Sequence, residues 1–186
     1  PSGSGKSSLV HAGLLPRILD TKGTNGIRAY DYVSIDVADI NLAANGFTNL
    51  LNELAANMLD WGNDEKGVFD GFSAQSLTDA LLNQPEEIIN HIKKWFSEAI
   101  TDNNTAGVNV PYPCFAIVID RLEALLAHSA VSENEKQKIF ALLETLSESN
   151  AFLVLLVTRN DFYPLISTYA PLMKNKARGA HLDIAP

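Results

Sequence analysis

The chain has 186 residues, a length typical of one domain. Hydrophobic residues make up 46% of it and charged residues 19%, so it has enough apolar side chains for a core and too little charge for a disordered tail. The net charge of −8 argues against sequence-independent binding to nucleic acid and against an anionic membrane surface, because both partners attract clustered cations.

Cysteine content and hydropathy exclude further classes of protein. Cys114 is the only cysteine, which excludes a disulfide-stapled secreted module. No stretch reaches the roughly eighteen consecutive apolar residues that cross a bilayer, and no signal-peptide pattern opens the chain. We therefore expect a cytoplasmic protein without nucleic-acid or membrane partners.

The first third of the chain contains two predicted helices around one strand. A helix over residues 6–15 opens directly out of a Gly/Ser loop, and Pro16 predicts its end or a kink. Residues 30–36 alternate and are rich in aromatic and β-branched side chains, which predicts a strand. Leucines and a methionine at helical spacing predict a helix over residues 47–59.

The rest of the chain alternates between helices and apolar strands. Two strands are predicted from the apolar runs FAIVI, which is followed by Asp120, and FLVLLV; a capping box at Ser132 starts a helix between them. Further helices are predicted over residues 76–82, from Pro85 onward and over 162–169, a polar loop over 101–113, and a short strand over 181–184. This order predicts an α/β fold with a mostly parallel sheet.

The strongest functional motif opens the chain. Residues 1–8, PSGSGKSS, reproduce the phosphate-binding loop G-x-x-x-x-G-K-[ST] (Walker A) apart from its first glycine. In this pattern Gly3 and Gly5 let the backbone turn tightly, with its N–H groups around a phosphate, Lys6 reaches the β- and γ-phosphates, and Ser7 ligates Mg²⁺. The alternative is a Gly/Ser linker, but a linker would not need the apolar helical pattern that follows.

Asp120 is the candidate second metal ligand. A carboxylate at the end of a buried strand lies at the C-terminal edge of a parallel sheet, where a phosphate-loop fold holds Mg²⁺ (Walker B). Apolar runs that end in Asp are common, so the prediction depends on the pairing of this one with Lys6 and Ser7.

Glu123 and Arg159 are the candidate catalytic residues. Glu123 could polarise an attacking water, or it could be a surface residue in the first turn of a helix. Arg159 could contact a γ-phosphate as a sensor, or form a structural ion pair with Asp161. Arg121 follows Asp120 where many ATPases of this class carry a catalytic glutamate, which predicts slow hydrolysis.

Four segments together resemble a known family. PSGSGKSSLVHAGLLPRI, VIDRLEALL, LLVTRNDFYPLI and HLDIAP are similar to the ATPase domain of the novel STAND signal-transduction NTPases, a branch of the STAND P-loop ATPases with AAA-like ancestry. The resemblance runs over residues 1–186, although residues 41–111 match only in helical character.

The resemblance implies a nucleotide site and a switch. It implies ATP binding by residues 3–8, Mg²⁺ at Ser7 and Asp120, a catalytic or positioning carboxylate at Glu123 and a sensor at Arg159. In such proteins ATP binding drives self-association, with effector and repeat domains in the same chain. The family's usual D-Q-F-E-E is replaced here by DRLEA, which puts the hydrolytic rate in doubt.

The resemblance also implies a three-layer α-β-α P-loop NTPase fold whose first, central strand precedes residue 1. Residues 1–186 are therefore expected to be part of a domain, cut from a larger protein, without that strand and without C-terminal helical or repeat parts.

Two other functions use the same motifs. A catalytic phosphotransferase or kinase needs an arginine-rich lid, and the chain has no arginine cluster. A non-enzymatic interaction module with a degenerate nucleotide site would not bind ATP tightly. We expect instead a slowly hydrolysing, ATP-dependent regulatory switch.

Overall fold

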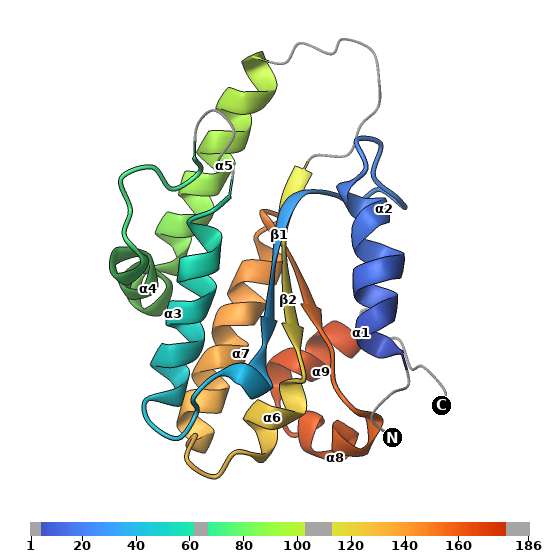
Figure 1. The fold of residues 1–186 in the computed structure, drawn as a ribbon, viewed down its shortest axis with the longest axis vertical. Coiled ribbons are helices and arrows are strands. Elements are labelled where there is room, and N and C mark those ends of the chain that lie inside the picture. Colours follow the sequence, from blue (N-terminus) through green and yellow to red (C-terminus); the bar gives the residue numbers. More distant parts are fainter. Residues whose placement is uncertain (1–4, 62–66, 103–112, 178–186) are drawn as a thin grey trace.

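A computed structural model describes residues 5–61, 67–102 and 113–177 (Figure 1). The strands are β1 (Arg28–Asp36), β2 (Pro113–Asp120) and β3 (Phe152–Leu156). The helical segments are α1 (Lys6–Ser8), η1 (Leu9–Leu14), α2 (Leu15–Leu19), η2 (Val37–Asp39), α3 (Gly46–Met58), α4 (Ala74–Asn83), α5 (Pro85–Asp102), α6 (Leu122–Ala127), α7 (Glu133–Glu148), η3 (Asn160–Phe162), α8 (Tyr163–Ile166) and α9 (Ala170–Ala177).

The predicted α/β fold with a parallel sheet is confirmed for these residues. The sheet has the strand order β1-β2-β3, and both pairings are parallel. β1 and β2 end in register, with Asp36 opposite Asp120. The strand predicted over residues 181–184 lies outside the described residues.

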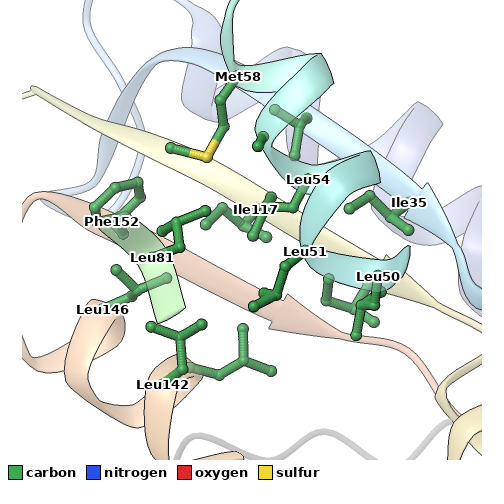
Figure 2. Packing of buried hydrophobic residues seen from close by; sticks show 14 of the residues in the cluster. Ile35, Leu50, Leu51, Leu54, Met58, Leu81, Ile117, Leu142, Leu146 and Phe152 are labelled. Atoms are coloured by element: carbon green, nitrogen blue, oxygen red, sulfur yellow. The ribbon is translucent and has the colours of Figure 1, made fainter. Parts of the chain in front are cut away.

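Helices pack against both faces of the sheet and form two separate apolar clusters (Figure 1). The larger cluster joins one face to α3, α4, α5 and α7, and Figure 2 shows leucines of α3 and α7 meeting Ile117 of β2 and Phe152 of β3. The smaller cluster joins the other face to α2, through Leu15 and Ile18. Side chains alternate along a strand, so Ala116 and Val118 contact this second cluster.

The first helix is longer than predicted, because Pro16 does not end it. Helical structure continues from Lys6 to Leu19, with a π-helical stretch over Leu9–Leu14. Proline has no N–H for the hydrogen-bond ladder of a helix, and Pro16 directly follows the stretch in which that ladder is already irregular, because its bonds are π-helical.

Capping explains where two later helices begin. The predicted capping box of α7 is confirmed, because Ser132 accepts from the Glu135 N–H while Glu135 accepts from the Ser132 N–H. α4 begins two residues before the predicted position, since Ser73 and Ser76 form a second capping box.

The three strands differ in burial. Every residue of β2 is buried, as predicted for an apolar strand between two neighbours. β3 is as apolar, yet Leu153–Leu156 are only half-buried because β3 lies at the edge of the sheet. β1 forms the other edge and has an irregularity in register between Ala29 and Asp31.

Among the described helices, none is both long and apolar enough to span a membrane.

Candidate functional site

The described part of the phosphate loop is its last glycine and the helix that follows. Gly5 has φ 76° and ψ 10°, a left-handed conformation that glycine adopts without strain. Lys6 and Ser7 form the first turn after it and are half-buried. Gly3 and Ser4 lie outside the described residues, and Ser8 is exposed.

Asp120 ends β2 and is 9% exposed. Because side chains alternate, its carboxylate lies on the same sheet face as Val118, which packs toward the helix that begins at Lys6. Figure 1 shows that α1 begins near the end of the sheet to which the strands point. Lys6, Ser7 and Asp120 therefore share one face and one end of the sheet.

One of the two carboxylate oxygens of Asp120 has a hydrogen-bond partner. Its Oδ1 accepts the Arg121 N–H at 2.8 Å. Within the described chain, Oδ2 accepts no hydrogen bond. One oxygen of a buried carboxylate is thus available to a metal or a water.

The structure brings Glu123 and Arg159 together. Glu123 lies in the first turn of α6, and its Oε2 accepts the Arg159 N–H at 3.3 Å. Arg159 follows β3, the strand beside β2. Both predicted catalytic residues therefore lie at the edge of the sheet that carries Asp120, joined by a side chain to main chain contact.

The side chain of Arg159 pairs with Asp161, the structural alternative considered from the sequence. Its Nε donates to Oδ1 at 3.1 Å and its Nη2 to Oδ2 at 2.6 Å. The hydrogen bond to Arg159 holds the pKa of Asp161 below its usual value, and the same bond raises the pKa of Arg159. Both groups are exposed, so solvent screens this pair.

A cluster that the sequence analysis missed lies next to Asp120. The Arg121 guanidinium pairs with Asp36 at the end of β1 and, at 2.9 Å, with Asp39 in η2. The hydrogen bond to Asp36 is the main reason that the pKa of Arg121 is raised. The available signal was the sequence VSID, which ends β1 in Asp36 as IVID ends β2 in Asp120.

Thr158 adds an unpaired polar atom between β3 and Arg159. Its hydroxyl oxygen is buried and has no hydrogen-bond partner in the described chain. The preceding residue, Val157, bonds to both sides of Asp120: its N–H donates to Ile119 O, and its carbonyl accepts from Leu122 N–H. Buried hydroxyls are nearly always paired, so Thr158 is open to a water or a ligand.

The donor set suits Mg²⁺ better than a transition metal. No group of three or more His, Cys, Asp or Glu side chains that could hold a metal occurs among the residues described. Mg²⁺ needs no such cage, because it binds through one or two protein oxygens together with phosphates and waters. The free oxygen of Asp120 and the hydroxyl of Ser7 fit that requirement.

Comparisons with known proteins give one match. No curated protein and no solved structure matches the chain significantly. The family model described as Novel STAND NTPase 1 matches residues 1–186, the full length of the chain. The chain therefore belongs to the Novel STAND NTPase 1 family.

Proposed function

We propose that this domain binds ATP with Mg²⁺, hydrolyses it slowly and acts as the regulatory switch of a multidomain signal-transduction ATPase. Membership of a STAND NTPase family supports nucleotide binding. The observation that carries the proposal is the arrangement of Gly5, Lys6 and Ser7 at a helix start on the sheet face to which Asp120 belongs. With Gly3, Ser4 and Ser8 they would complete the proposed phosphate-binding residues 3–8.

In this proposal each site residue has one task. Lys6 contacts the β- and γ-phosphates, and Ser7 and Asp120 hold Mg²⁺, which when bound neutralises phosphate charge. Glu123 orients the attacking water. Arg159 contacts the γ-phosphate, which requires it to leave its ion pair with Asp161.

Slow hydrolysis follows from the residue next to Asp120. Arg121 cannot act as a general base, because its guanidinium stays protonated and pairs with Asp36 and Asp39. The carboxylate that α6 offers in place of a catalytic glutamate is Glu123, and it already accepts the Arg159 N–H. A turnover near the ~10 per second of a typical enzyme would contradict the switch.

The proposed fold is the three-layer P-loop arrangement with one more strand beside β3. The apolar, half-buried outer edge of β3 supports this, since such an edge is normally covered or paired. A phosphate loop connects a strand to its helix, so the residues before the loop are the expected source of that strand. In the full-length protein, the outward N–H groups of β3 should then be protected from hydrogen exchange.

Binding is tested by calorimetry on the full-length protein, with and without Mg²⁺. Lys6→Ala should abolish tight Mg²⁺-dependent ATP binding. Lys138→Ala, which removes an exposed lysine of α7, is the matched control and should bind as wild type does. Absence of heat with any nucleotide would instead support the interaction module.

The switch is tested by sedimentation of the full-length protein. If ATP binding drives self-association, the particle should grow with ATP and revert with ADP. Effector and repeat domains elsewhere in the protein would then be its output and its input. An unchanged particle in both nucleotides would contradict the switch while leaving nucleotide binding intact.

A further inference from the structure

Arg121 has a backbone conformation that its side chain does not favour. Its φ is 50° and its ψ 44°, in the left-handed region. Among the described residues, the other non-glycine residues with positive φ are Asn25, Asn45 and Asn150. Asparagine tolerates this region because its short polar side chain bonds locally, whereas arginine has no such compensation. Other contacts must therefore hold Arg121 in place.

Two carboxylates supply those contacts. Nε of Arg121 donates to Oδ1 of Asp36, and Nη2 donates to Oδ1 of Asp39 at 2.9 Å. Asp36 is itself fixed, because its Oδ1 also accepts the Ala38 N–H at 3.1 Å. The guanidinium thus ties the turn after β2 to the end of β1 and to η2.

The main chain of Arg121 meets Asp120 at the same point. In the left-handed conformation its N–H donates to Asp120 Oδ1 at 2.8 Å. Asp36 and Asp120 are partners in the register of β1 and β2, so two carboxylates end neighbouring strands. Arg121 binds one through its side chain and the other through its main chain, and leaves Oδ2 of Asp120 available.

We infer that Arg121 is a positioning residue for Asp120: its ion pairs with Asp36 and Asp39 hold the left-handed turn that orients the Asp120 carboxylate toward Mg²⁺. This inference rests on the proposed function and assigns to Arg121 a role other than replacing a catalytic glutamate. It predicts that breaking the ion pairs weakens the metal-dependent part of nucleotide binding, although the inference assigns neither Asp36 nor Asp39 as a metal ligand.

The test compares ATP affinity with and without Mg²⁺ in the full-length protein. Arg121→Gln should lower the Mg²⁺-dependent affinity about 10-fold, the usual effect of losing a residue that orients a metal ligand, and leave the Mg²⁺-free affinity unchanged. Asp36→Asn combined with Asp39→Asn should do the same. All three substitutions act on one turn. The triple variant should therefore lose no more Mg²⁺-dependent affinity than Arg121→Gln alone or the double aspartate variant alone.

Lys174→Gln is the matched control. Lys174 also bridges two carboxylates, those of Glu144 and Glu148, and its side chain is 46% exposed, as is that of Arg121. It should bind ATP as wild type does. If Arg121→Gln behaves like this control while wild type shows Mg²⁺-dependent binding, the inference is overturned and the proposed function stands.

A second readout separates the inference from the proposed function. If wild type shows no Mg²⁺-dependent binding, the proposed function fails. Hydrogen exchange of the Arg121 amide then tests whether the ion pairs hold the turn. Faster exchange in the Asp36→Asn, Asp39→Asn variant supports the positioning of Asp120, and unchanged exchange overturns it.

Discussion

The two outer strands of the described sheet, β1 and β3, differ in how well their outer edges are protected against pairing with a further strand. The edge of β1 is protected: its register is irregular at Tyr30, and the Asp31 carboxylate accepts the Tyr32 N–H at 2.7 Å. β1 also ends in Asp36, whose Oδ1 accepts from the Ala38 N–H and from Nε of Arg121. Natural proteins use bulges and inward-pointing charges of this kind to block pairing with further strands.

β3 has none of these devices among its described residues. It is a regular apolar strand, half-buried from Leu153 to Leu156, and is followed by the unpaired hydroxyl of Thr158. An edge of this kind invites a partner strand. In the described part of the sheet, the β1 edge thus carries features that block further pairing and the β3 edge does not, which supports the proposed extra strand beside β3.

The largest expected effect comes from truncating β3. Leu155 packs with the second apolar cluster and would be fully buried by an added strand. Leu155→Ala should then cost about 3 kcal/mol in the free energy of unfolding of the full-length protein. Tyr32→Ala on β1 should cost less than about 1 kcal/mol, because Tyr32 is 39% exposed. Equal, small losses in denaturant titrations would contradict pairing at β3.

A second substitution measures how well β1 is packed without a partner strand. Tyr30 is 46% exposed, yet its ring lies edge-on to Trp95, Phe96 and Phe115 at centroid distances of 5.1, 6.1 and 5.8 Å. Tyr30→Ala should therefore destabilise the fold by about 1 to 2 kcal/mol, more than Tyr32→Ala does. If the two variants unfold at the same denaturant concentration, these ring contacts contribute nothing.

A smaller effect on stability is expected from replacing Thr158, whose buried hydroxyl follows β3. Thr158→Val should leave the unfolding free energy unchanged or raise it by up to about 1 kcal/mol, since valine needs no hydrogen-bond partner. Thr78→Val is the control: the Thr78 hydroxyl is buried and donates to Ala74 O at 2.8 Å, so its loss should destabilise. A Thr158→Val protein as unstable as Thr78→Val would show that Thr158 is paired in solution.

The smallest effect concerns the charge that protects β1. Burial raises the pKa of Asp31, so the folded state favours the protonated carboxyl. That contribution to stability is present at low pH and is lost as the pH rises through the folded-state pKa. Asp31→Asn, which is always neutral, should be more stable than wild type at pH 7 by less than about 1 kcal/mol, because solvent screens this half-buried group. The difference should shrink as the pH is lowered.

Local sequence signals were sufficient for most elements and for part of the site. The periodicity of α3, the capping box of α7 and the apolar runs of β2 and β3 predicted their structures because each signal depends on near neighbours in the chain. The Asp at the end of an apolar run likewise predicted the position of Asp120, since a parallel strand brings its last residue to one edge of the sheet.

Other features needed the fold. FAIVI and FLVLLV read alike, yet β2 is buried and β3 half-buried, because burial depends on which strands lie on either side. The ion pair of Arg121 with Asp36 joins residues 85 positions apart, and no local pattern indicates it. The sequence by itself determined most of the described elements, the motifs and the family. The tertiary structure decided which edge is open and which carboxylates Arg121 binds, because strand order and side-chain pairing are set by packing between distant segments.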